Sequence, residues 1–282
     1  MPDLMRSARR EEHMHRQMPR VIAHRGASRD EPEHTLSAYR RAIEEGADAV
    51  ECDVRLTADL HLVCVHDRRV NRTSNGRGVV SALELATLEG LDWGSWKERH
   101  PDDAEMPDQD RNRLLTLRRL LTTVTSCDRE VGLAIETKHP NRYRGQVERT
   151  LATVLRAFEL DGPPQPGRPE VCVMSFSQLA TQRMRKLCPH LPVVFLMEDT
   201  VPLRFRDGLL PKGVRIAGVS TTILPRYPDL VRRHHDRGQE VYVYTADEPE
   251  DIDRCMRMGV DAIITNRPAF VRRHIGLDGD VH

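Results

Sequence analysis

The fold is decided by residues 47–67, ADAVECDVRLTADLHLVCVHD, where two apolar runs stand too close together for a parallel connection. The runs Ala49–Leu56 and Leu62–His66 are separated by only five residues, whereas a parallel crossover needs a dozen or more. They therefore predict an antiparallel hairpin, with a two-residue turn at Ala58-Asp59.

Outside this hairpin, short apolar runs alternate with amphipathic helical patterns. The predicted strands are Val21–His24, Ala49–Leu56, Leu62–His66, Val131–Lys138, Val171–Ser175, Val193–Met197, Ile216–Ser220, Val241–Thr245 and Ala262–Thr265. The predicted helices are Thr35–Glu45, Leu115–Thr125, Gln146–Phe158, Gln178–Leu187, Pro228–Arg237 and Pro249–Met258. Without the return arm of the hairpin, eight parallel strands remain, the number in an α/β TIM (β/α)8 barrel. An open doubly wound sheet is the less favoured alternative, because no glycine-rich phosphate loop opens the first helix.

One connection is much longer than the others. The segment from about 67 to 113 is punctuated by Gly, Asp and Pro and weakly periodic, and it includes the turn signal Asn75-Gly76. It predicts a small inserted subdomain above the barrel mouth. We expect a barrel domain over residues 19–275, preceded by a polar, disordered tail over residues 1–18.

The composition argues against several classes of function. The 43 basic and 43 acidic residues leave no net charge, so no global field attracts nucleic acid or an anionic membrane. No apolar run reaches the ~18–20 residues of a membrane span, and the N-terminus lacks the apolar core of a secretory signal. The six cysteines show no zinc-ligand spacing. We expect a cytoplasmic protein without integral membrane association or nucleic-acid binding; its oligomeric state stays open.

Carboxylates interrupt two predicted strands that should be apolar on both faces. Alternation places Glu51 and Asp53 on one face of their strand, and Glu136 and Lys138 on one face of another. Buried carboxylates need a compensating cation, and all-oxygen ligation favours Mg²⁺ or Ca²⁺. Solvated strand ends or simple ion pairs are the alternative interpretation, which is less favoured for three carboxylates together with a lysine.

Two histidines and an arginine complete the predicted site. His24 and Arg25 end the first strand, at the rim where barrels carry catalytic residues. A two-residue hairpin turn pairs residues whose numbers sum to 117, which sets His66 opposite Glu51. The set suits phosphodiester cleavage: Arg25 can grip two phosphate oxygens, and one histidine can remove a proton while the other protonates the leaving alkoxide.

The same residues carry a resemblance to a known family. Residues 21–67 hold HRG, a PEHT helix start, an E-x-D strand and a terminal HD; NRTSNGRG, IETK, SF, YTAD and DAIITNRP follow in order to about residue 270. Together they resemble the glycerophosphodiester phosphodiesterases, within the phosphatidylinositol-phosphodiesterase-like TIM-barrel superfamily. The resemblance implies hydrolysis of small-molecule glycerophosphodiesters to sn-glycerol 3-phosphate and an alcohol, with a divalent cation as cofactor.

The resemblance also implies roles for the matched residues. They are Glu51, Asp53 and Glu136 as metal ligands, His24 and His66 as the catalytic acid/base pair, Arg25 and Lys138 as phosphate contacts, and Glu33, Phe176 and Tyr244 as near-site residues. The chain departs from the family pattern at His34, where Asn is usual, at Leu60, which replaces a turn Gly, at Thr137, which stands between Glu136 and Lys138, and at Tyr244, where Trp is common. Two alternative functions remain: a lysophospholipase D-like phosphodiesterase, which would need an apolar entrance, and a non-catalytic barrel that binds phosphorylated metabolites.

Overall fold

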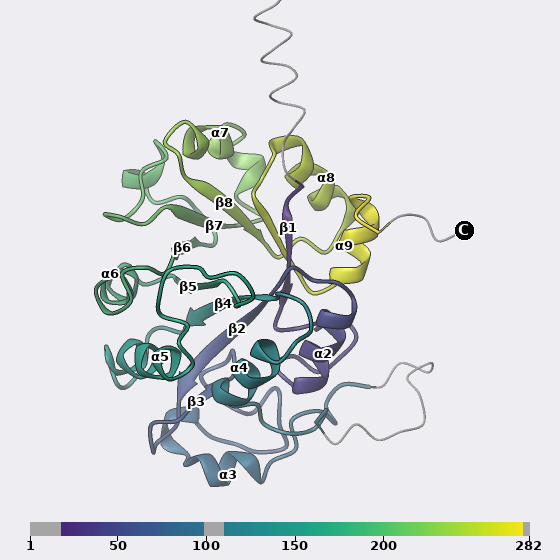
Figure 1. Cartoon of the computed structure of the whole chain (residues 1–282), viewed down its shortest axis with the longest axis vertical. Helices are drawn as coiled ribbons and strands as arrows, with labels where there is room; N and C mark the ends of the chain where they lie inside the picture. Colours follow the sequence, from purple (N-terminus) through teal and green to yellow (C-terminus); the bar gives the residue numbers. More distant parts are fainter. Residues whose placement is uncertain (1–17, 99–109, 279–282) are drawn as a thin grey trace, which may run out of the picture.

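A computed structural model describes residues 18–98 and 110–278. Eight parallel strands form the closed barrel that the sequence predicts (Figure 1). They are β1 (Arg20–His24), β2 (Ala49–Leu56), β4 (Gly132–Thr137), β5 (Val171–Ser175), β6 (Val193–Met197), β7 (Ile216–Ser220), β8 (Glu240–Tyr244) and β9 (Ala262–Thr265). The barrel closes because β1 pairs with both β2 and β9. Apart from Met18, the predicted tail over residues 1–18 lies outside the described residues.

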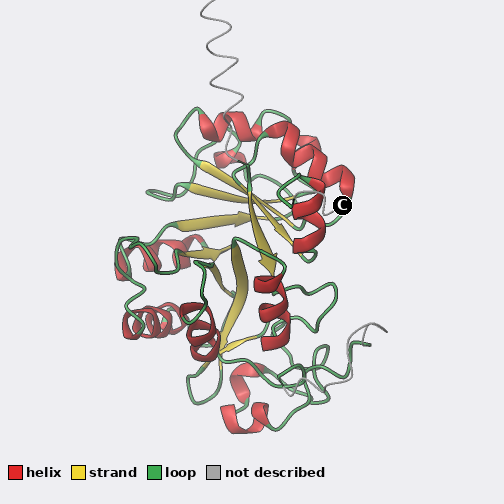
Figure 2. Cartoon of the chain, turned by 45° about the vertical axis from the view of Figure 1, so that its right-hand side comes forward, coloured by secondary structure: helices red, strands yellow, loops and turns green. Residues whose placement is uncertain are grey.

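Helices cover the outside of the barrel (Figure 2). The described α-helices are α2 (Leu36–Glu44), α3 (Leu85–Glu89), α4 (Leu117–Thr125), α5 (Gln146–Ala157), α6 (Gln178–Leu187), α7 (Leu230–His235), α8 (Pro249–Met258) and α9 (Pro268–His274), and the short 3₁₀ helices are η1 (Val80–Ala82), η2 (Leu203–Phe205) and η3 (Leu224–Arg226). Of these, α3 and η1 belong to the segment after β3 (Leu62–Cys64) and lie beside the hairpin. The six predicted helices are present, whereas α3 and α9 are not predicted by the patterns above. Pro268 is the signal that the prediction misses for α9, because proline often opens a helix. None of the helices in the described part of the chain is long and apolar enough to cross a membrane.

The strands separate two apolar layers. Ile22, Ala49 and Ala134 belong to a small buried cluster inside the barrel, while the opposite faces of the same strands pack against the helices in a larger one. Because side chains alternate along a strand, the acidic residues two and four positions beyond Ala49, and two beyond Ala134, also face the interior. The barrel axis at this end is therefore polar.

The hairpin after β2 differs from the prediction by one residue. Its return arm, β3 (Leu62–Cys64), pairs antiparallel with β2 and sets Val54 opposite Cys64, so paired residue numbers sum to 118 and not to 117. The predicted direct pairing of Glu51 with His66 is therefore wrong. A one-residue slip also exchanges the faces of the return arm, and the strand ends before His66.

The physical reason is a longer turn. Residues 58–60 form a three-residue loop, which closes with a hydrogen bond from Thr57 N to His61 O at 3.0 Å. Leu60 adopts a φ of +65°, a conformation that three-residue hairpin loops require at one position and that usually falls to glycine.

The segment predicted as an insert forms a small core beside this hairpin. Its buried members include Val70, Val80, Leu88 and Trp93, packed on Val63 and Val65. Lys97 Nζ donates to Ser28 O at 2.5 Å, and the Tyr143 hydroxyl donates to Ser81 O at 2.9 Å. Since Ser28 follows β1 and Tyr143 follows β4, the insert borders the barrel mouth at the carboxyl ends of these strands.

Candidate active site

Three carboxylates meet inside the carboxyl end of the barrel. Glu51 and Asp53 come from β2, and Glu136 comes from the neighbouring β4, where it pairs with Asp53. Their exposed fractions are only 1%, 1% and 7%, and ligand oxygens of all three lie within 4.8 Å of one another. The structure thus brings together the carboxylates that the sequence singles out, in an arrangement that could hold a metal ion.

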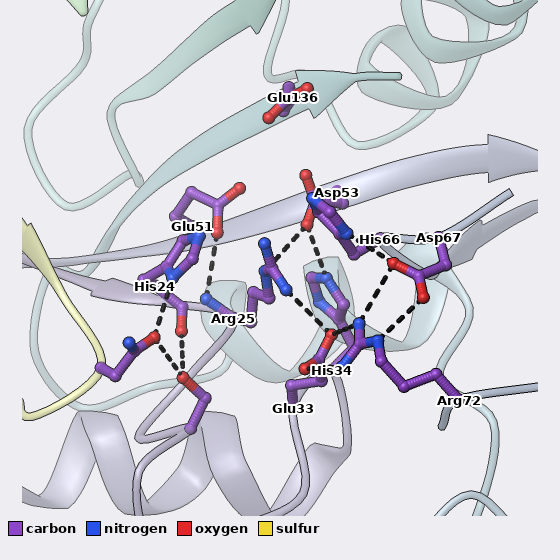
Figure 3. A network of polar contacts seen from close by, with 12 residues as sticks. His24, Arg25, Glu33, His34, Glu51, Asp53, His66, Asp67, Arg72 and Glu136 are labelled. Carbon is purple, nitrogen blue, oxygen red and sulfur yellow. Dashed lines mark hydrogen bonds and ion pairs between the residues drawn. The ribbon is translucent and has the colours of Figure 1, made fainter. Parts of the chain in front are cut away.

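Two cations lie against this cluster. Lys138 Nζ is 3.2 Å from Asp53 Oδ1 and 2.8 Å from Glu136 Oε1. Arg25 Nε is 3.2 Å from Asp53 Oδ2, and its backbone N–H donates to Glu51 Oε2 at 3.0 Å (Figure 3). Arg25 Nε is buried and faces Asp53 without a well-aligned hydrogen bond.

Charge is unevenly shared among the three carboxyl groups. Burial raises the pKa of Glu51 well above its usual range, and the charge of Asp53 adds to this. Burial and Asp53 also raise the pKa of Glu136 to about 8. Burial opposes ionisation of Asp53 too, but Lys138 and the hydrogen-bonded His34 help hold its pKa well below the usual range. The cluster therefore lacks positive charge, which a divalent cation would supply.

Asp53 has a further partner that the sequence reasoning does not assign. His34 Nε2 lies 2.9 Å from Asp53 Oδ2, and His34 Nδ1 lies 2.8 Å from the Tyr39 hydroxyl. Asp53, as a carboxylate, accepts from His34 Nε2, and the Tyr39 hydroxyl also donates to the Glu51 carbonyl at 3.0 Å. His34 has a φ of +61°, and such strain persists where surrounding contacts impose it. The only sequence signal is the departure from the family's asparagine.

His24 reaches the site from the end of β1. Its Nδ1 lies 2.8 Å from Asn266 Oδ1, while Asn266 donates from Nδ2 and from its backbone N to Asp247 at 2.5 and 2.7 Å. Since a carboxylate only accepts, Asn266 turns its oxygen toward His24, which places the imidazole proton on Nδ1. Burial and the charge of Arg25 lower the pKa of His24 to about 3. The ring is therefore neutral at physiological pH, with Nε2 unprotonated.

His66 comes from the segment that follows β3. Its Nδ1 lies 2.8 Å from Asp67 Oδ1, and Arg55 donates twice to its carbonyl, at 2.9 and 2.7 Å. Burial lowers the pKa of His66; the charge of Arg25 acts in the same direction and that of Asp53 opposes it. Figure 3 shows the His66 ring beside Asp53, although the register of the hairpin differs from the predicted one.

Glu33 and Arg72 connect the site to the insert. Glu33 accepts from Arg25 at 3.0 Å and, with both oxygens, from Arg72 at 2.7 and 2.8 Å. Arg72 also donates to Asp67 at 2.8 Å, so it bridges toward His66 (Figure 3). Burial alone would raise the pKa of Glu33, but Arg72 and Arg25 hold it at about 2. Sequence reasoning misses this bridge, because nothing in the spacing of the HD and NRT motifs pairs Arg72 with Glu33.

Two aromatic rings lie on another side of the cluster. Phe176 follows β5 and Tyr244 ends β8, and their rings meet edge to face with centroids 6.1 Å apart. Lys138 Nζ is 5.9 Å from the Phe176 centroid, which places this pair next to the carboxylates. The Tyr244 hydroxyl donates to Met197 O at 2.8 Å. Phe176 is 39% exposed, so a ligand can contact its ring.

Comparison with known sequences places this constellation in a family. The family model of the glycerophosphoryl diester phosphodiesterases matches residues 24–270. The chain belongs to this family. The Mycobacterium tuberculosis protein named "Probable glycerophosphodiester phosphodiesterase 1" is 45% identical over 250 residues, which cover 89% of this chain and 90% of that protein. The Bacillus subtilis glycerophosphodiester phosphodiesterase is 32% identical over 88% of this chain and 83% of that protein.

Solved structures agree on the fold. An Oleispira antarctica phosphodiesterase in complex with its product sn-glycerol-3-phosphate has a TM-score of 0.77 and 24% identity, covering 92% of this chain and 97% of that one. A glycerophosphodiester phosphodiesterase from Parabacteroides distasonis has a TM-score of 0.73 at the same 24% identity, covering 92% and 97%. The family and the TIM barrel predicted from the motifs are both confirmed.

Departures from the family pattern have definite places in this phosphodiesterase. His34 contacts Asp53, Leu60 occupies the positive-φ position of the hairpin turn, and Tyr244 packs on Phe176. None of them displaces a member of the carboxylate cluster. The departures therefore change the surroundings of the site and leave its charged centre in place.

Proposed function

We propose that this chain is a metal-dependent phosphodiesterase that hydrolyses glycerophosphodiesters to sn-glycerol 3-phosphate and an alcohol. The observation that carries the proposal is the meeting of three buried carboxylates with two histidines, His24 and His66, each held at Nδ1. Neither Nε2 atom has a partner among residues 18–98 and 110–278. Membership of the phosphodiesterase family supports the reaction class.

The residues present fit a hard divalent cation. Glu51, Asp53 and Glu136 offer only carboxylate oxygens, within 4.8 Å of one another, and such donors suit Mg²⁺ or Ca²⁺. The raised pKa of Glu51 and of Glu136 is what a cluster short of positive charge produces. When bound, the cation would neutralise charge on the phosphoryl oxygens and help to activate an attacking oxygen.

Arg25 and Lys138 would hold the phosphate. Arg25 lies beside the carboxylate cluster and has a planar fork of donors, which suits a bidentate contact with phosphate oxygens. Lys138 adds a point charge at the carboxylates, 2.8 Å from Glu136. Both side chains are largely buried, so their charges act with little screening on the charge that develops in the transition state.

His24 and His66 would exchange the two protons of the reaction. In each ring the partner at Nδ1 fixes the tautomer and leaves Nε2 to face the substrate. The low pKa of His24 favours the unprotonated form. Asp67, held by Arg72, stabilises a proton on His66. One imidazole can therefore accept the proton of the attacking oxygen while the other protonates the leaving alkoxide, each step contributing ~10²–10⁴ in rate.

Release of sn-glycerol 3-phosphate from a panel of glycerophosphodiesters, with and without EDTA, tests the proposal. We expect turnover that EDTA abolishes and that Mg²⁺ or Ca²⁺ restores. Full activity in EDTA would overturn the metal dependence, and no release from any member of the panel would overturn the reaction itself.

A lysophospholipase D-like activity is the second candidate, and exposed apolar side chains near the site favour it. Phe176 and Leu179, after β5, are 39% and 61% exposed, and Leu203, after β6, is 78% exposed. They lie at the same end of the barrel as the carboxylates and could contact an acyl chain. Comparing turnover of glycerophosphocholine with that of a short-chain lysophosphatidylcholine separates the two. The polar insert predicts that the deacylated diester is preferred; a preference for the lysolipid that Leu179→Ser and Leu203→Ser abolish would favour the second candidate.

A further inference from the structure

A basic cavity adjoins the proposed active site. Its volume is about 410 Å³, and it lies between residues 79–82 of the insert and residues 140–143 after β4. We use the name basic cavity for this space because its charged lining consists of Arg55, Arg68, Lys138 and Arg142. No carboxylate is among the residues that line it.

Arg55 is the innermost guanidinium of the basic cavity. It is half-buried, and it donates from Nε and Nη2 to the carbonyl of His66. It forms no ion pair with any carboxylate in the described part of the chain. Its hydrogen bonds go to a neutral carbonyl, so the guanidinium can also bind an anionic ligand.

Arg68 and Arg142 lie at the outer end, and both are exposed. The Arg142 side chain donates only a long hydrogen bond of 3.4 Å to Ser81 O and stacks on the Tyr143 ring at 5.7 Å. The Arg68 side chain has no hydrogen bond or ion pair within residues 18–98 and 110–278. Two guanidinium groups therefore face the cavity with unused donors.

Several other arginines in the described part of the chain are paired with carboxylates. Arg72 binds Glu33 with two hydrogen bonds. A second cavity of about 410 Å³, at the amino ends of the strands, also contains an arginine, but there Arg20 pairs with Glu170 and Glu240 at 3.5 and 3.2 Å. The basic cavity thus differs from this second cavity, which is lined by several acidic residues.

The basic cavity is continuous with the charged centre through two residues. Lys138 lines the cavity and contacts Asp53 and Glu136. Arg55 follows Asp53 by two positions on β2, so both side chains leave the same face of the strand. A group attached to a phosphate at Lys138 can therefore extend past Arg55 into the cavity.

We propose that the basic cavity binds the alcohol portion of the diester and selects alcohols that carry a further phosphate group. This inference rests on the proposed function and adds a substrate class to it. Arg55, Arg68 and Arg142 supply donors for the second phosphate, and guanidinium groups bind phosphate oxygens in pairs. A cationic alcohol such as choline meets like charge in the same space.

Three diesters of glycerol 3-phosphate test the inference: those with choline, with glycerol, and with a second glycerol 3-phosphate as the alcohol. We expect the highest kcat/KM for the phosphorylated alcohol and the lowest for choline. In the double variant Arg68→Gln/Arg142→Gln, KM for the phosphorylated diester rises ~10-fold, as expected for loss of charge-assisted hydrogen bonds, while kcat/KM for the glycerol diester changes less than ~2-fold. Raising the salt concentration from ~50 to ~500 mM reduces the difference in kcat/KM between these substrates, because salt screens the charges.

Arg69→Gln is the matched control, because Arg69 is the exposed neighbour of Arg68 but does not line the cavity. Binding is also measured separately from turnover. The full-length His24→Ala protein, with and without the double substitution, is titrated calorimetrically with the phosphorylated diester. Equal kcat/KM for phosphorylated and neutral diesters, or an equal loss in the control, overturns the inference while leaving the proposed function standing. Turnover of none of the three diesters overturns the proposed function, and the titration then decides whether the cavity binds the second phosphate.

Discussion

His34 and Asp53 lie 19 positions apart in the sequence, yet His34 Nε2 is 2.9 Å from Asp53 Oδ2. Both groups are buried, with side-chain exposures of 4% and 1%. The contact adds a donor to a carboxylate that already faces Lys138 and Arg25. His34 is thus a positioning residue for one of the proposed metal ligands, and it is held in turn by Tyr39.

We predict that His34→Ala weakens metal binding by ~10–100-fold, the usual cost of removing a partner that orients a ligand. His34→Asn is the matched control, because asparagine keeps a donor and tolerates the positive φ of this position. Calorimetric titration with Mg²⁺ and Ca²⁺ measures the effect directly. Wild-type affinity in the Ala variant would show that Asp53 needs no support from His34.

Glu136 lies close to Asp53, so the substitution Glu136→Gln should change the melting temperature in opposite directions without and with bound metal. Glu136→Gln removes a buried negative charge whose ionisation is disfavoured, as the pKa of about 8 indicates. In EDTA near pH 8 the melting temperature should therefore rise by about 2–4 °C, the equivalent of ~1 kcal/mol for a domain of this size. With Mg²⁺ or Ca²⁺ in excess, the wild type should have the higher melting temperature, because metal binding stabilises it more than the variant. Glu44→Gln, at an exposed helix position, serves as control. The same ranking in both buffers would argue against Glu136 as a ligand.

The tautomer argument predicts a graded series at the histidines. His24→Ala and His66→Ala should each lower kcat by ~10²–10⁴ without changing the melting temperature by more than a few degrees. Asn266→Ala should lower kcat by a smaller factor and leave KM nearly unchanged, because it removes the acceptor that orients His24 and leaves both histidine rings in place. His61→Ala, in the exposed hairpin turn, is the control. A near-wild-type rate in either histidine variant would reassign that proton transfer.

The periodicity of a strand predicts which side chains share a face, but it does not predict how the strand pairs with its neighbour. Both cases occur at β2. Alternation alone places Glu51 and Asp53 toward the barrel interior, because burial of one face is a property of the strand itself. The pairing with the return arm depends on how many residues the turn contains, and Leu60 gives no glycine-like signal for a third one. The sequence therefore predicts which residues enter the site, but not their neighbours across the hairpin.

Partners contributed by loops are harder still to predict. Contacts such as His34 with Asp53 and Arg72 with Glu33 depend on the path of the chain after β1 and through the insert. That path includes positive φ angles at Arg25 and His34, which surrounding contacts impose and local propensity does not favour. Periodicity carries no information about such a path.

The bridge between Arg72 and Glu33 predicts a pH-dependent contribution to stability. The pKa of Glu33 in the folded protein is about 2, below the ~4.3 of an unfolded chain. Its contribution is therefore present above about pH 4.3 and is lost as the pH falls toward 2. Arg72→Gln should lower the melting temperature at pH 7, and the deficit relative to wild type should shrink as the pH falls from about 4.3 toward about 2. Arg77→Gln, exposed elsewhere in the insert, should have no such effect. A deficit independent of pH would mean that Arg72 acts through packing and not through charge.

The turn of the hairpin predicts a stabilising substitution. Leu60 has a φ of +65° and is 43% exposed. Its backbone is therefore strained, and burial of its side chain offsets little of that strain. A left-handed conformation costs an L-residue ~1–2 kcal/mol, and glycine avoids this at an entropic cost of ~0.5–1 kcal/mol. Leu60→Gly should therefore raise the free energy of unfolding by ~0.5–1 kcal/mol, measured as a higher urea midpoint at unchanged slope. Ala58→Gly, in the same turn at negative φ, should be destabilising by a similar amount because it brings only the entropic cost. Equal effects of the two substitutions would mean that the turn relaxes without strain, and the preference for three residues over two would then have to come from the packing of the return arm.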